Sequence, residues 1–489
     1  MDRAPCRQGD ANGQAVMTGR SSLAFVVVVV LSLGPRTAFA HVGSPDVFLD
    51  AQAGPYRLLV TVRPPYAVPG VADVEVLTTS PDIDDVRIVP LPLTGPGARF
   101  APTADIATRS LHDPRLFTGQ LWMMSAGAWQ VRVTATGSRG EGTLAVPVPT
   151  LPKATLAMGR GLRALLIGFM LLLCAGFVTI ISAIAREASL EAGEKPGLRA
   201  RRRGWIASLA ATCLVVGAMA FGNRWWAAEA TTYARYVYKP LEAISTITQD
   251  ERLRLELRDP GWLASRRLDD FVPDHGHLMH LFILSPSLDR LWHLHPDEVT
   301  TGVFDVRLPD MPQGEYDLFA DLVHRTGVSE TVTGRLQTSG IRGAPLTGDD
   351  SGWPVASGVT SETGGRIVWI RDDQLLRSKA LTAFTFRVED DAGRPATDLE
   401  LYMGMPGHAV FVRRDRRVFA HVHPSGSAPM AALDIAMPSR SAHDHPEAGL
   451  PPTVSFPYGF PEPGDYRIFV QIKRSGRIVT GVFDAHVVD

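Results

Sequence analysis

The chain has 489 residues, a length that suggests about three domains. Its formal net charge is −2, from 49 Lys and Arg residues against 51 Asp and Glu residues, and no basic patch is interleaved with aromatic residues. This balance argues against nucleic acid as a partner.

Residues 1–40 are predicted to be a secretory signal peptide. The stretch 21–33 is almost wholly apolar, follows Arg20 and leads to the small-x-small sequence AFA at 38–40, the pattern of a cleaved signal. Cleavage there makes His41 the first residue of the mature protein. Its α-amine and ring together suit Cu(II) as a ligand pair, and an exposed terminus without a ligand role is the equal alternative.

Two uncharged stretches, 164–185 and 205–223, are each long enough to cross a bilayer. The loop between them, 186–204, carries six basic residues against three glutamates, so the positive-inside rule makes it cytoplasmic. The regions on either side then face outward. We therefore predict a protein of the cytoplasmic (inner) membrane with N-terminal and C-terminal domains on the periplasmic side.

The three cysteines restrict the chemistry of the outward-facing regions. Cys6 lies in the signal peptide, and Cys174 and Cys213 lie in the two predicted spans. The exported regions therefore have no thiol and no disulfide. A soft metal site there would have to use histidine and methionine.

The exported regions have the pattern of short strands separated by Pro and Gly, with no long helical period. Three segments of the exported regions share one pattern, and they begin at Gly127, Gly314 and Gly464. In each, an aromatic residue follows two positions after the glycine within an alternating strand, and a turn with glycine leads to a return strand. The predicted fold is mainly β, with two transmembrane helices. We expect three β-sandwich modules, at 41–150, 251–338 and 365–489, with a linker at 339–364.

The second and third modules share a repeat of histidines at an offset of 128 residues. Five of the fourteen histidines of the chain fall within residues 274–296. The spacing H-x12-H-x-H-P occurs twice, and a preceding HGH in the first copy becomes MGM in the second. The candidate metal ligands are thus His275, His277, His280, His293 and His295, matched by Met403, Met405, His408, His421 and His423.

Strand geometry predicts that these side chains converge. Residues i and i+2 of a strand share a face, so His293 and His295 stand side by side. A hairpin with its turn at 285–288 places His280 opposite His293, and the same arithmetic places His408 opposite His421. A slip of one residue in the register would send His280 to the other face.

Copper is the metal that this donor set favours, with zinc as the alternative. Imidazole suits Cu(II) and Zn, whereas the thioether of methionine selects Cu(I). A structural zinc site needs four ligands, the fourth of which His275 or His277 could supply. The competing interpretation is that HxH pairs on an ordinary strand surface were duplicated without a metal role.

The sequence resembles bacterial membrane-anchored proteins with extracytoplasmic immunoglobulin-like modules of the YtkA-like and FixH-like kind, which are related in style to CopC-like copper-resistance domains. The resemblance rests on HVGSPDV and PYRLLVTVRPP near the N-terminus, PDHGHLMHLF with HLHP, and MPGHAVFVRRD with HVHP. It implies localisation and fold. The CopC-like ligand pattern carries over only to His41, because the late Asp and His of that family are missing from GTLAVPVPT at 142–150.

The leading hypothesis is a membrane-anchored, extracytoplasmic protein that binds or passes copper, with the bilayer and a metal-transport or metallochaperone protein as its partners. The alternative is a structural or partner-binding β-sandwich receptor in which the histidines are incidental or sense pH. An enzyme is not expected, because no P-loop, HExxH or nucleophile elbow occurs in the exported regions. A mononuclear copper redox enzyme stays open as the enzymatic alternative.

Overall fold

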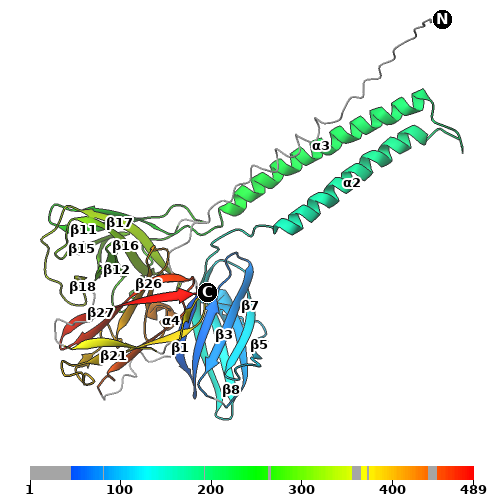
Figure 1. Ribbon diagram of the computed structural model, residues 1–489. Coiled ribbons are helices and arrows are strands. Elements are labelled where there is room, and N and C mark those ends of the chain that lie inside the picture. Colours follow the sequence, from blue (N-terminus) through cyan, green and yellow to red (C-terminus); the bar gives the residue numbers. More distant parts are fainter. Residues whose placement is uncertain are drawn as a thin grey trace, which may run out of the picture. The chain divides into compact units, whose positions relative to one another are not determined.

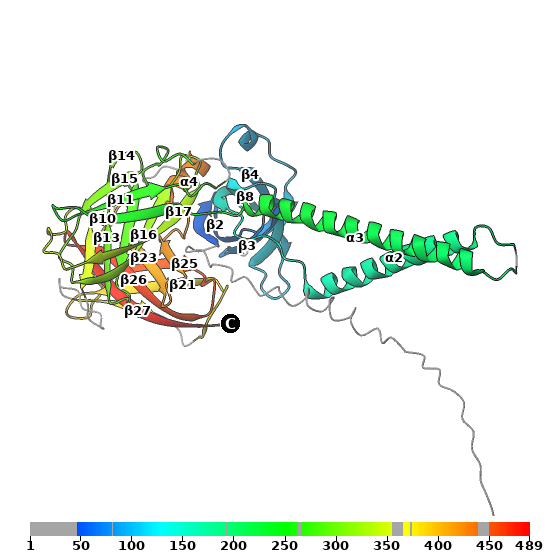
Figure 2. The ribbon, with the colours of Figure 1, turned by 90° about the horizontal axis from the view of Figure 1, so that it is seen from above.

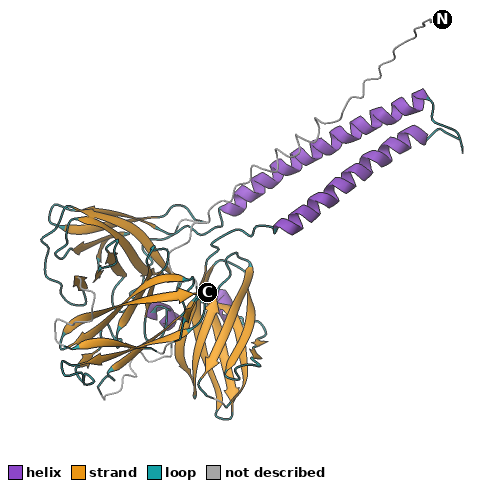
Figure 3. Cartoon of the chain, viewed as in Figure 1, coloured by secondary structure: helices purple, strands orange, loops and turns teal. Residues whose placement is uncertain are grey.

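The computed structural model describes residues 46–80, 82–191, 193–262, 266–354, 365–371, 374–438 and 449–489. The predicted signal peptide and His41 lie outside these ranges. Strands make up most of the regular structure (Figure 3), so the predicted mainly β fold class is confirmed.

The first module is a sandwich of two sheets. One sheet has the order β1-β2-β3-β7-β6 and the other β5-β4-β8-β9. Alternate residues of β2, such as Leu58, Val60 and Val62, are fully buried between the sheets, as the period of a strand requires. The elements are β1 (Val47–Ala53), β2 (Tyr56–Arg63), β3 (Gly70–Thr78), β4 (Ile83–Pro92), η1 (Pro96–Arg99), β5 (Asp105–Ile106), β6 (Thr108–Arg109), β7 (Leu116–Met123), β8 (Gly127–Gly137) and β9 (Gly140–Thr150).

Two long helices follow, α2 (Arg160–Glu187) and α3 (Leu198–Ala234). Both are long and apolar enough to cross a membrane, and they contain the two predicted spans. The helices run side by side in both views (Figures 1 and 2), and the Ser182 hydroxyl donates a hydrogen bond to the carbonyl of Gly204 across their contact.

The second module is one nine-stranded sheet folded around a single core, because Leu255 of β11 and Ile283 of β12 pack in the same cluster. Its last strand, β18, belongs to the segment predicted as a linker and pairs with β13. The strands are β10 (Glu242–Ile247), β11 (Arg252–Arg258), β12 (Met279–Leu284), β13 (Arg290–Leu294), β14 (Asp297–Thr300), β15 (Val303–Arg307), β16 (Gly314–Val323), β17 (Ser329–Thr338) and β18 (Ser351–Pro354).

The third module again has two sheets, β19-β21-β25 and β20-β27-β26-β23-β24, with β22 paired to β26. Its elements are β19 (Arg366–Ile370), β20 (Leu376–Arg377), β21 (Thr382–Glu389), β22 (Leu399–Glu400), β23 (His408–Arg413), β24 (Phe419–Val422), α4 (Met430–Ala436), β25 (Thr453–Tyr458), β26 (Gly464–Arg474) and β27 (Arg477–Val488).

The three predicted closing hairpins are confirmed. Strands β8, β16 and β26 begin at Gly127, Gly314 and Gly464, and each pairs antiparallel with the strand that follows it.

The second and third modules dock through matching strands, β12 and β23. Both strands are buried on both faces. Leu281 and Ile283 face the core of their own module, whereas Phe282 and Leu284 enter an apolar cluster shared with Val410 of β23. The histidines lie on the same face as this apolar cluster, toward one end of each hairpin. His280, for example, stands two residues before Phe282, and residues two apart in a strand share a face.

The predicted hairpin register was wrong by two residues. His293 pairs with Phe282 instead of His280, and His421 pairs with Val410 instead of His408. The turn itself lies where it was predicted, since the Leu288 amide donates to the Ser285 carbonyl at 2.9 Å. Leu288 then adopts a left-handed conformation (φ 55°), which adds residues to the return side of the loop. An even shift keeps each side chain on its face, so the convergence of the histidines survives.

Candidate metal centre

Two groups of three histidines gather where the second and third modules meet. In each group the nitrogen atoms that could bind a metal lie within 4.8 Å of one another, as judged over the described part of the chain. The inner trio comes entirely from the second module, and the shared trio joins the second module to the third. The inner trio is His280, His293 and His295, and the shared trio is His275, His408 and His423.

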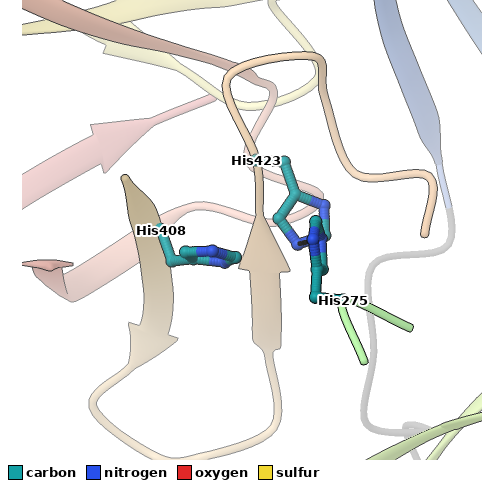
Figure 4. Close-up of side chains that lie close together, drawn as sticks. All are labelled: His275, His408 and His423. Carbon is teal, nitrogen blue, oxygen red and sulfur yellow. Dashed lines mark hydrogen bonds between the residues drawn. The ribbon is translucent and has the colours of Figure 1, made fainter. Parts of the chain in front are cut away.

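The inner trio contains the three residues that the spacing predicted. The shared trio differs from the prediction, because His275 takes the place expected for His421. Figure 4 shows the rings of His275 and His423 close together, with His408 on the neighbouring strand. Nε2 of His275 lies 3.3 Å from Nε2 of His423. His275 therefore reaches across the interface, although its sequence neighbours belong to the second module.

The turns that carry the flanking HGH and MGM sequences have the same backbone shape. His275 and Met403 are both left-handed, with φ of 52° and 50°. Such a conformation is costly for a residue other than glycine and tends to persist at functional sites. The two turns touch, because Nδ1 of His275 donates to the carbonyl of Met403 at 2.8 Å.

A backbone acceptor decides which nitrogen of His280 carries the hydrogen. Nε2 lies 3.0 Å from the carbonyl oxygen of Asp274, and a carbonyl only accepts. Nε2 is therefore the N–H, and Nδ1 presents a bare lone pair. That lone pair faces Nε2 of His293 at 3.2 Å.

His293 presents a second bare lone pair to the same gap. Its Nδ1 lies 3.0 Å from Oε1 of Gln471, whose amide nitrogen donates to the Ser351 hydroxyl and so fixes the orientation of the amide. The Tyr402 hydroxyl, which donates to the carbonyl of Asp349, lies 3.3 Å from the same Nδ1. Nδ1 is therefore the donor, and Nε2 carries no hydrogen.

The third module repeats this arrangement. Nε2 of His408 lies 3.1 Å from the carbonyl oxygen of Tyr402, and its Nδ1 lies 3.1 Å from Nε2 of His421. Nδ1 of His421 faces the carboxylate of Asp321 at 3.5 Å. The lone pairs of His408 Nδ1 and His421 Nε2 therefore point at each other. His421 adds a fourth imidazole to the shared trio.

The remaining ligand candidates have unused buried nitrogens. Nδ1 of His295 lies 3.0 Å from the carboxylate of Asp350, and its Nε2 is buried with no hydrogen-bond partner among the described residues. Nδ1 of His423 is also buried, and within the described ranges it has no partner. A histidine held by a carboxylate through one nitrogen, with the other nitrogen free, is the usual arrangement of a metal ligand.

Six histidines of the cluster have a lowered pKa. Burial, with the neighbouring imidazoles, holds the pKa of four members well below the ordinary value of 6.5. Burial also lowers the pKa of His275 and His295. The four members are His280, His293, His408 and His423.

The other predicted residues lie around this cluster. The ring of His277 stacks on that of His295 with the centroids 4.0 Å apart, and its Nε2 lies 3.3 Å from the carboxylate of Asp349. Met403 is buried and contacts His275 through its backbone, whereas Met405 is partly exposed. The role of these two methionines as thioether ligands stays a prediction.

Sequence reasoning missed the residues that hold the rings in place. Asp349 and Asp350 lie in the segment predicted as a linker, and Gln471 and Asp321 lie on strands far from the histidine motifs. No local pattern marks them. Tyr402 had one signal, because it stands 128 residues after Asp274 and so occupies the same place in the repeat.

Comparisons with known proteins add little beyond the geometry. A family described as a domain of unknown function (DUF8832) matches residues 361–489, which include the whole third module. Comparison with curated proteins finds no match.

Similar solved structures include a tetra-tandem repeat of a large adhesion protein (9% identity, 86% of this chain and 71% of that chain, TM-score 0.15). An ICAM-5 D1–D4 ectodomain fragment aligns with 8% identity over 86% of this chain and 73% of that chain, TM-score 0.15. A putative membrane anchored protein from Corynebacterium diphtheriae aligns with 9% identity over 91% of this chain and 96% of that chain, TM-score 0.15. Likeness at this level assigns no function.

Proposed function

We propose that this chain binds metal ions on the outer side of the cytoplasmic membrane, and that copper is the metal it handles. The observation that carries the proposal is the pair of facing lone pairs, His280 with His293 and His408 with His421. Two such lone pairs repel unless a cation lies between or beside them. Burial disfavours a proton as that cation, because it holds the pKa of His280, His293 and His408 low.

The distances suit a transition metal. Two imidazole nitrogens bound about 2.0 Å from one ion at angles of roughly 90 to 110° lie roughly 2.9 to 3.3 Å apart. The contacts in the cluster, 3.1 Å, 3.2 Å and 3.3 Å, fall within that range. His280, His293 and His295 would hold one ion, and His275, His408, His421 and His423 would hold a second.

Copper is preferred to zinc on the composition of the donors. The site consists of imidazoles with two methionines on the flanking turn, and a thioether selects Cu(I) over zinc. The resemblance to copper-related extracytoplasmic modules agrees with this choice. The two apolar helices act as an anchor, and a metal-transport or metallochaperone protein is the partner that such a role requires.

The test is copper titration of the full chain purified in detergent, with bound metal counted after removal of free ions. We expect copper to bind, and the variant His293→Ala/His295→Ala to bind one ion fewer, since it destroys one of the two groups. His486→Ala is the matched control, because this exposed histidine pairs with Asp465 on β26, within the third module. A wild-type chain that retains no copper contradicts the proposal.

A further inference from the structure

The metal ligands proposed above are almost closed off from solvent. His293 and His408 have no exposed surface, and His280 and His423 are 2% exposed. An ion that reaches them must first shed its water at some more accessible point. The structure therefore has to provide ligands at the rim of the cluster.

His277 and Asp349 have the position that this step requires. Their side chains are 30% and 33% exposed, and Nε2 of His277 lies 3.3 Å from Oδ2 of Asp349. The face of the His277 ring stacks on that of His295. Nε2 of His295 is buried, has no partner among the residues described, and belongs to the inner trio, so the ring contact joins the exposed pair to that trio.

We propose that His277 and Asp349 form the uptake point of the cluster, where a hydrated copper ion first binds before it passes to His295. This inference rests on the proposed function and adds the route by which metal reaches the buried site. His277 is thus assigned as a transient ligand, and His295 as the resident one.

The chemistry is a sequence of ligand exchanges with no change of oxidation state. The Asp349 carboxylate and the His277 imidazole each replace a water molecule of the incoming ion, and both donor types suit Cu(II). Nε2 of His295 then replaces the carboxylate, which returns to solvent. Nδ1 of His280 and Nε2 of His293 replace the His277 imidazole and a remaining water molecule, so His277 is released as well. Asp350, 23% exposed and adjacent, adds negative charge that concentrates cations at this rim.

His275 is less suited to this role, although it too is only partly buried. Its Nδ1 donates to the Met403 carbonyl and its Nε2 already faces His423. His277 has no contact with the shared trio among those described, and its ring contacts are instead with His280 and His295 of the inner trio.

The test is stopped-flow mixing of metal-free full chain with Cu(II), followed by the copper–imidazole absorption, for wild type, His277→Ala and Asp349→Asn. We expect both variants to take up copper about 10-fold more slowly, since charge focusing changes association rates by at least this factor, with the final stoichiometry unchanged. His486→Ala, which breaks an exposed His–Asp pair elsewhere, should take up copper at the wild-type rate.

Three results would overturn the inference. Unchanged uptake rates in both variants, with normal copper binding by the wild type, would contradict the uptake point alone. A stoichiometry lower by one ion in His277→Ala would make His277 a resident ligand. A wild-type chain that takes up no copper would contradict the proposed function itself and this inference with it.

Discussion

Nδ1 of His280 lies 3.2 Å from Nε2 of His293, and the acceptors bound to the other nitrogen of each ring leave both of these nitrogens without a hydrogen. Nε2 of His280 donates to the carbonyl of Asp274, and Nδ1 of His293 donates to the amide oxygen of Gln471. A hydrogen bond between the two rings would therefore require one of these two bonds to break. An arrangement of this kind is costly in a protein that holds nothing there. It becomes favourable when both lone pairs bind one cation.

Asp350 should control the affinity of the inner trio without binding metal itself. Its carboxylate accepts from Nδ1 of His295 at 3.0 Å and thereby points Nε2 inward. Loss of such a partner weakens metal binding by about 10- to 100-fold. We expect this loss in Asp350→Ala, measured by competition with a copper chelator, and none in Asp465→Ala, the partner of exposed His486. Equal affinities in the two variants would contradict this role.

Gln471 should stabilise the metal-free protein across the interface. It lies in the third module, is fully buried, and bonds to His293 and Ser351 of the second. Gln471→Leu leaves His293 and Ser351 buried without this hydrogen-bond partner, so we expect a loss of about 1 to 3 kcal/mol in the free energy of unfolding. Chemical denaturation measures it. Gln120→Leu, an exposed glutamine, should change stability by less than about 0.5 kcal/mol, and a similar change in both variants would exclude a special role for Gln471.

Copper binding should resist mild acid. The pKa of His280, His293 and His408 lies well below 6.5, because burial disfavours the charged ring. These ligands therefore stay neutral as the pH falls through 6.5, where free imidazole becomes protonated. Affinity measured between about pH 7.5 and 6 should change less than that of a histidine-containing peptide. A parallel loss in protein and peptide would mean that copper binds to exposed histidines.

His324 gives the opposite pH dependence, away from the metal centre. Burial alone lowers its pKa, but hydrogen bonds to Glu330 and Asp270 outweigh burial and raise it. A raised pKa contributes stability that is complete below 6.5 and is lost as the pH rises through the folded value. We expect wild type to exceed His324→Gln in unfolding free energy more at about pH 5.5 than at about pH 8.5. A larger stability difference at about pH 8.5 than at about pH 5.5 would contradict the ion pairs of His324 with Glu330 and Asp270.

Much of the fold followed from local patterns. The hairpins that begin at Gly127, Gly314 and Gly464 could be predicted because strand alternation and turn glycines are encoded over a few residues. The 128-residue offset placed His280 and His408 at equivalent positions, and the structure gives both the same backbone acceptor geometry.

The remaining features of the site depend on how the second and third modules dock, and the spacing of residues along a strand carries no information about docking. The apolar face of Phe282 and Leu284 pairs with its duplicate in the third module, and this contact brings His275 to His408. The register error had a local cause, because the left-handed Leu288 lengthened the loop. The supporting residues Asp350 and Gln471 come from segments that carry no histidine motif, so the spacing of the histidines could not predict them.

X-ray absorption spectroscopy of the copper-loaded full chain tests the central claim most directly. Facing lone pairs predict that copper is surrounded mainly by imidazole nitrogens at about 2.0 Å, with the multiple scattering that identifies histidine rings. The signal should diminish in His293→Ala/His295→Ala and persist in His486→Ala. A copper shell made of water or carboxylate oxygen, the same in all three proteins, would contradict the assignment of the histidine cluster as a metal centre.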